Sequence, residues 1–123
     1  MPKNTYEKII NKKDPARWKQ VPEMQKFGPS AIEYLVKALG DDDKWVRLLA
    51  ADVLGDIGDV AAAKPLVEML KDQDQDVRFI AAGALGKIPE QKSIESLEQI
   101  CTSDNCFVRI AAEESIERLK NLK

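Results

Sequence analysis

The residues in this chain best suited to chemistry are four arginines that recur at a nearly constant interval. They lie 30, 31 and 31 residues apart: Arg17, Arg47, Arg78 and Arg109. A column of guanidinium groups could bind an anion, since arginine recognises carboxylate and phosphate well. Asp43 and Asp74, however, precede two of the arginines by four residues, the spacing of side chains that meet on a helix. We therefore favour structural Arg–Asp pairs over an anion-binding ladder.

Other chemistry has little support. The sequence contains no histidine, which removes histidine-based catalysis and histidine-ligated metal sites. Cys101 and Cys106 are too few ligands for zinc, and we interpret them as a buried thiol and an incidental one. The acidic stretches "GDDDK" and "KDQDQD" lack the regular oxygen spacing of a calcium loop. We expect no metal and no cofactor.

Composition limits the class of protein. The chain has 123 residues, 44% of them hydrophobic and 33% charged, which suits one domain with its own core. Nineteen basic against 21 acidic residues give a net charge of −2, which argues against a nucleic-acid partner. No segment is long and apolar enough for a membrane span, and "MPKNTYEKIINKK" does not resemble a signal peptide. We expect a cytoplasmic protein that does not bind membranes.

The arginines belong to a repeat. The segments "WVRLLAADVLGDIGD", "DVRFIAAGALGKIPE" and "FVRIAAEESIERLKN" align without gaps, and "PARWKQVPEMQKFG" is a fainter copy. A second type of segment lies between them: "SAIEYLVKAL", "VAAAKPLVEML" and "KSIESLEQIC". Both types carry apolar residues at helical spacing. The unit is therefore a helical hairpin of about thirty residues, with a helix A followed by an arginine-bearing helix B.

Capping residues support these helices. Four side chains suited to N-caps precede the B helices: Asp14, Asp43, Asp74 and Asn105. Gly28 and Gly58 follow two B helices and are candidates for C-caps. Pro22 and Pro65 fall inside proposed helices, where we expect bends.

The pattern "VRLLAADVLGDIGD…KPLVEML" resembles the HEAT-like repeat family, in particular the short repeats of phycobilin lyases. The resemblance implies an all-α, right-handed α-solenoid of about four stacked hairpins, with B helices on the concave wall. We expect one domain, residues 1–123, with repeats at approximately 1–28, 29–58, 59–89 and 90–123. Glu113, Glu114 and Glu117 replace small residues of the preceding copy, as expected for a capping repeat.

Helical geometry assigns faces to the B-helix positions. At 100° per residue, the core side of the third copy carries Val77, Ala81, Leu85 and Ile88. The residue after each arginine points almost opposite to that core, and all four are apolar: Trp18, Leu48, Phe79 and Ile110. The next position, Leu49 or Ile80, lies on the flank that we expect to meet the following B helix.

An apolar row with a charged rim is typical of an interaction surface. The rim residues are Lys26, Asp52, Asp56, Lys87 and Arg118, and we expect the last four of these to tune specificity. Two interpretations stay open: the row binds a partner, or strong curvature lets the four side chains pack on one another. Trp45 and Phe107 open two B helices, and we interpret them as covers for the loops between helices, with an exposed aromatic contact as the alternative.

The resemblance also allows comparison with enzymes that have similar repeats. Deoxyhypusine hydroxylase, a similar scaffold, binds iron through His-Glu pairs at the two positions after the repeated arginine. Here those positions read Leu48-Leu49, Phe79-Ile80 and Ile110-Ala111. HEAT-like DNA glycosylases are a poor match for a short, slightly acidic chain. We predict a non-enzymatic scaffold that binds a protein or peptide. The alternative is an accessory subunit of a bilin-lyase-like or other small-ligand-handling complex. The sequence leaves the oligomeric state open.

Overall fold

The computed structural model describes residues 1–122, and its regular structure there is entirely helical. Three short 3₁₀ segments are η1 (Arg17–Gln20), η2 (Pro22–Ala31) and η3 (Val60–Ala62). The α-helices are α1 (Pro2–Ile9), α2 (Ile32–Ala38), α3 (Lys44–Ile57), α4 (Ala63–Met69), α5 (Gln75–Leu85), α6 (Ser93–Ser103) and α7 (Cys106–Lys120). The all-α prediction is confirmed.

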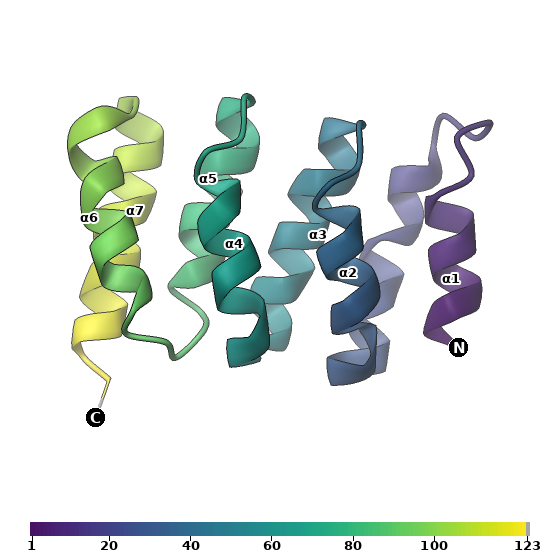
Figure 1. Ribbon diagram of the computed structural model, residues 1–123, viewed down its shortest axis with the longest axis horizontal. Coiled ribbons are helices and arrows are strands. Elements are labelled where there is room, and N and C mark those ends of the chain that lie inside the picture. The colour runs from purple at the N-terminus through teal and green to yellow at the C-terminus, as the bar shows by residue number, and fades with distance from the viewer. Residues whose placement is uncertain (123) are drawn as a thin grey trace.

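The helices form two layers along one axis. Figure 1 shows α2, α4 and α6 in the front layer, with α3, α5 and α7 behind them and the chain termini at opposite ends. In the rear layer α3 packs on α5 and α5 packs on α7. We call α2, α4 and α6 the A layer, and α3, α5 and α7 the B layer. The molecule is a stack of helical hairpins, as the repeat predicts.

The capping residues set the limits of the B-layer helices. The Asp43 carboxylate accepts a hydrogen bond from the Trp45 amide at 2.8 Å, and Asp74 and Asn105 cap α5 and α7 in the same way. Gly58 ends α3 with φ of +75°, a conformation that favours glycine. Gly28 also has a positive φ, +57° with ψ of −140°, but it lies within η2 and interrupts the helical turns there. The predicted caps at Asp43, Asp74, Asn105 and Gly58 are confirmed. The cap predictions for Asp14 and Gly28 were wrong, because no α-helix forms in the first copy: the Asp14 carboxylate accepts from the Ala16 amide, and η1 begins after Ala16 without a side-chain cap.

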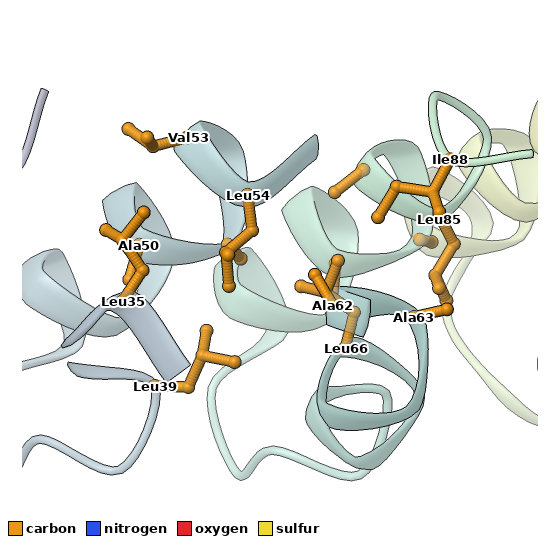
Figure 2. Close-up of a cluster of buried hydrophobic side chains, with 14 of the residues drawn as sticks. Leu35, Leu39, Ala50, Val53, Leu54, Ala62, Ala63, Leu66, Leu85 and Ile88 are labelled. Carbon is orange, nitrogen blue, oxygen red and sulfur yellow. The ribbon is translucent and has the colours of Figure 1, made fainter. Parts of the chain in front are cut away.

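The core lies between the two layers. Leu35 of α2, Leu54 of α3 and Leu66 of α4 have no exposed surface and lie in the cluster drawn in Figure 2. The four predicted core residues of the third copy are likewise fully buried: Val77, Ala81, Leu85 and Ile88. Each fully buried aliphatic side chain of leucine size stabilises the fold by about 1.5–3 kcal/mol. The hairpins therefore depend on this shared interior rather than on helix propensity alone.

Small residues bring the B-layer helices together. A Cβ atom on Gly55 would lie 2.8 Å from the Cβ of Ala84, and one on Gly86 would lie 2.8 Å from the Cβ of Ser115. The flank that carries Ala84 therefore faces the preceding helix. Ile80, one turn before Ala84, shares this flank. The expectation that Ile80 and Leu49 meet the following helix was wrong, because helical periodicity gives angles around a helix and not the direction of stacking.

The arginine column pairs between repeats. Arg47 Nε lies 2.9 Å from Asp72, and Arg78 Nε lies 2.7 Å from Asp104. Each of the two guanidinium groups also donates to a backbone carbonyl in the loop before its own helix. The structural interpretation is confirmed for Arg47 and Arg78, but the predicted partners were wrong. Asp43 and Asp74 cap helices, and aspartates about 25 residues farther along the chain accept from the arginines.

The first arginine is the most enclosed of the four. Arg17 is only 5% exposed, donates twice to Asp41 at 2.7 Å, and donates to the Ile9 carbonyl at 2.8 Å. Arg109, the last of the column, is exposed and has no ion pair within residues 1–122. The column therefore stabilises the N-terminal and central hairpins more than the last one.

The two prolines differ from the expected bends in opposite directions. The first copy of the B segment is the pair η1 and η2, which meet at Pro22, so no α-helix forms there. Proline lacks an amide donor and disrupts the helix before it. Pro65 instead lies in the first turn of α4, directly after η3, where a missing donor is tolerated.

Candidate functional site: an apolar groove over α5 and α7

The exposed side of the B layer contains a groove of about 410 Å³. Its walls come from α5 and α7, with one residue from α3, and we call it the α5–α7 groove. The lining residues are Asp52, Phe79, Ile80, Gly83, Ala84, Lys87, Phe107, Ile110, Ala111, Glu114, Ser115 and Arg118. The small residues on this surface leave the space that the groove occupies.

Three large apolar side chains make the groove hydrophobic. Phe79 on α5 is 41% exposed, and Phe107 and Ile110 on α7 are 72% and 49% exposed. Phe79 and Phe107 also line a second hollow that continues toward Gln75 and Asn105, at the N-terminal ends of the same two helices. The apolar surface therefore extends along both helices rather than ending at one pocket.

The rim of the groove is charged and unevenly paired. Lys87 Nζ lies 2.9 Å from the Asp56 carboxylate, an ion pair that joins α3 to the end of α5. Asp52, one turn before Asp56, makes no side-chain hydrogen bond or ion pair with any residue from 1 to 122. Partial burial, with the charge of Asp56 adding to it and Lys87 opposing it, raises the pKa of the Asp52 carboxyl. Ionisation of the Asp52 carboxyl is therefore less favourable than that of an aspartate in water.

The groove brings together most of the residues that the repeat singled out. It contains Asp52, Phe79, Lys87, Ile110 and Arg118, and Asp56 reaches it through Lys87. Leu48 is half-buried on α3 and lies outside the groove lining. Trp18 packs against the core from η1. The predicted row of four apolar side chains is therefore divided. Trp18 and Leu48 are partly buried, whereas Phe79 and Ile110 are exposed in the groove.

Phe107 is the groove residue that sequence reasoning placed elsewhere. It was interpreted as a loop cover, yet it is the most exposed large apolar side chain of the groove. Trp45, at the matching position of α3, is half exposed, and the ammonium group of Lys44 lies 5.1 Å from the centre of its ring. Both exposures favour the alternative interpretation, an exposed aromatic contact. The available signal was spacing, since Phe107 precedes Ile110 by three residues and so shares its helical face.

Ligand sites of other kinds were also considered. Within residues 1–122 no three histidine, cysteine, aspartate or glutamate side chains gather as metal ligands would. Across the same residues, no helix has the length and hydrophobicity to cross a bilayer. Cys101 and Cys106 are free thiols, and partial burial raises the pKa of Cys101.

Comparison with known proteins agrees with the architecture. The sequence profile of the family described as HEAT repeats matches residues 32–117. Human deoxyhypusine hydroxylase, in complex with glycerol, superimposes with a TM-score of 0.86 at 27% identity over 97% of this chain. This chain spans only 43% of the length of that hydroxylase chain.

Two further structures are similar in fold. The complex of CpcE and CpcF of phycocyanin lyase from Nostoc sp. PCC7120 gives a TM-score of 0.77 at 22% identity, with 89% of this chain and 73% of that chain covered. An engineered protein gives 0.70 at 20% identity, with 94% and 62% covered. No curated protein sequence matches this chain.

Proposed function

This chain belongs to the HEAT-repeat family, and we propose that it is a non-enzymatic scaffold that binds another protein through the α5–α7 groove. The observation that carries the proposal is the exposure of Phe79, Phe107 and Ile110 side by side on adjacent helices. Apolar surface in contact with water is unfavourable by about 25 cal/mol per Å² relative to burial. A partner that covers these side chains recovers that free energy.

The shape of the surface suits a protein segment. A groove of about 410 Å³ can accept large side chains of a partner, and the hollow beside it extends the contact along the helices. Binding energy at protein interfaces concentrates in a few large side chains that fill such depressions, surrounded by a polar rim. Phe79 and Phe107 provide the apolar centre, and Asp52, Lys87 and Arg118 belong to the rim.

Catalysis is not part of this proposal. The likeness to deoxyhypusine hydroxylase extends over less than half of that chain. The two positions after the repeated arginine carry Phe79 and Ile80 in α5, and Ile110 and Ala111 in α7. None of these side chains coordinates a metal or transfers a proton. What this chain shares with the hydroxylase is, in our proposal, the scaffold alone.

A second candidate is the handling of a small apolar ligand. The groove volume lies in the range of small-molecule pockets, roughly 300–1,000 Å³. The fold is similar to that of the CpcE and CpcF complex of phycocyanin lyase. Titration of the chain with a bilin, followed by absorbance, tests this candidate. A saturable spectral change that Phe79→Asp abolishes would favour it over protein binding.

The main proposal is tested by affinity capture from a lysate of the source organism with three forms of the chain. Wild type and Val60→Asp are expected to retain a common protein, and Phe79→Asp is expected to lose it. Val60 is the matched control, because it is 52% exposed but lies in η3, away from the groove. Rebinding of the purified protein at a fixed stoichiometry completes the test.

Folding is checked in the same variants. Phe79→Asp should retain wild-type helical circular dichroism because the side chain is already exposed, whereas Leu85→Asp should unfold the chain because Leu85 is fully buried. If Phe79→Asp melts early, the residue belongs to the core and the groove is not a free surface. If capture is the same with and without Phe79, the binding proposal is wrong.

A further inference from the structure

The two walls of the α5–α7 groove differ in charge. On the α3 side, Asp52 and Asp56 lie one helical turn apart and share the single cation Lys87. On the α7 side, Glu114 and Arg118 lie one turn apart and balance each other. The uncompensated charge of the rim is therefore negative and lies on the α3 side, at Asp52.

Asp52 is set apart from the other acidic residues of the chain by its surroundings. Asp41, Asp72 and Asp104 accept hydrogen bonds from arginines, and Asp43, Asp59 and Asp74 cap helical segments. Asp52 does neither within residues 1–122, although it is half-buried and lines the same groove as Ile80 and Ala84. Burial raises the pKa of this carboxyl, and Asp56 adds to the effect. A carboxylate in this position gains most from a cation that arrives together with apolar surface, because desolvation strengthens the ion pair.

Lys87 supplies that cation only in part, because it is paired with Asp56. Its ammonium group lies 2.9 Å from Asp56, on the turn of α3 after Asp52. The Arg118 guanidinium group is exposed near the end of α7, on the opposite wall. Charges that face water are screened over about 8 Å at physiological ionic strength. Lys87 therefore offsets the charge of Asp52 only in part, and the apolar groove keeps a net negative charge at Asp52.

From this arrangement we infer that the partner is a protein segment that places an apolar side chain between Phe79, Phe107 and Ile110 and a lysine or arginine against Asp52. The inference rests on the proposed function and specifies its partner chemistry. The apolar side chain provides most of the affinity, and the basic side chain provides orientation and selectivity. Acidic and purely apolar segments are disfavoured, because both leave Asp52 without a counter-charge in a desolvated interface.

The test uses a display library of random 12-residue peptides against the full chain. Peptides are selected on wild type, and those that also bind Phe79→Asp are removed. We expect the remaining peptides to contain lysine or arginine close to an aromatic or aliphatic residue more often than the unselected library does.

One selected peptide is then measured by fluorescence anisotropy in a double-mutant cycle. Asp52→Asn is expected to weaken binding roughly three- to tenfold, in the range of a partly exposed ion pair. Replacement of the peptide's basic residue by glutamine should weaken binding to wild type by the same factor. The same replacement should not weaken binding to Asp52→Asn any further. Glu68→Gln, which removes an exposed carboxylate from α4 in the other layer, is the control and should leave the affinity unchanged.

The possible results distinguish failure of the inferred partner chemistry from failure of the groove as a binding site. Phe79-dependent peptides without a basic excess, or with an acidic excess, would overturn the inference and leave the groove as a binding site. A failure to select any Phe79-dependent peptide would overturn both. Self-association in sedimentation that Phe79→Asp abolishes would identify a second copy of this chain as the occupant, and would also overturn the inference.

Discussion

The first and last arginine-bearing segments occupy equivalent positions in the repeat but differ in their exposure. In the first, Arg17 is 5% exposed and Trp18 packs against the core. In the last, Arg109 is exposed and Ile110 is 49% exposed. The same pair of positions, a repeated arginine followed by an apolar residue, forms structural contacts at one end of the stack and free surface at the other.

The difference follows from the backbone around each pair. Pro22 divides the first segment into η1 and η2, and both pack on α1, so the short irregular turns enclose Trp18. The last segment is α7, a continuous helix of 15 residues whose face opposite the core stays outward. The residue type at a repeated position therefore does not decide its role, because the regularity of the segment decides which way it points.

The largest expected effect tests the arginines. Arg17→Ala removes the donor to Asp41 and to the Ile9 carbonyl and leaves a mostly buried carboxylate without its cation. We expect a loss of about 3–5 kcal/mol in the free energy of unfolding. Arg109→Ala should change it by less than about 0.5 kcal/mol. Urea unfolding followed by circular dichroism measures both; equal losses would mean that the two ends do not differ as described.

The second prediction concerns the residues after the arginines. Trp18→Ala should destabilise the chain by about 2–3 kcal/mol, because it opens a space beside the core. Phe79→Ala should cost less than about 1 kcal/mol, since Phe79 is 41% exposed. The order should reverse for binding, where Phe79→Ala has the larger effect on a groove-selected peptide. A larger thermal shift for Phe79→Ala than for Trp18→Ala would assign Phe79 to the core.

The third prediction separates the packed flank of the B layer from its open face. Gly55→Ala should cost about 2 kcal/mol, because the added methyl would lie 2.9 Å from the Cα of Ala84, which only a movement of the helix can relieve. Gly83→Ala meets no atom within 4 Å and should stabilise α5 by about 0.5–1 kcal/mol. Thermal unfolding of the two variants gives the sign of each change. A destabilising Gly83→Ala would show that the groove surface is closed.

The smallest effect concerns the pH dependence of stability at the groove. The pKa of Asp52 is raised above its ordinary value of 3.8, so its ionisation opposes folding as the pH rises through the interval above 3.8. Asp52→Asn should therefore be more stable than wild type at neutral pH, by about 0.5 kcal/mol or less, and equal to it below that interval. Chemical unfolding at several pH values measures the difference.

Asp104→Asn is the control of opposite sign. Burial opposes ionisation of Asp104, but hydrogen bonds from Arg78 and the Asn105 amide outweigh it and lower its pKa. Its contribution to stability is therefore present above pH 3.8 and is lost as the pH falls through the lowered value. Asp104→Asn should be less stable than wild type at neutral pH. A stabilised Asp104→Asn, or a destabilised Asp52→Asn, would contradict the assigned charge environments.

Much of this architecture could be predicted. The sequence predicted the repeat period, the capping residues and the four core positions from Val77 to Ile88. These features depend on interactions within about thirty residues, namely hydrogen bonds to a cap and the burial of one helical face. The groove was predicted in part. Phe79 and Ile110 were identified by their angle, whereas an exposed contact for Phe107 was only the alternative interpretation, although Phe107 lies on the same face. The acceptors of the arginines were missed because they lie in other repeats.

By itself the sequence determined the period, the helical class, the core face and the absence of histidine chemistry. Only the tertiary structure decided which apolar residues remain exposed, which aspartates accept from the arginines, and which flank of each helix meets its predecessor. Those outcomes depend on how neighbouring repeats stack. The close approach of Gly55 to Ala84, and of Gly86 to Ser115, sets the distance between adjacent B-layer helices. A helical wheel describes one helix at a time, whereas the exposure and the ion pairs of a side chain depend on how two helices pack against each other.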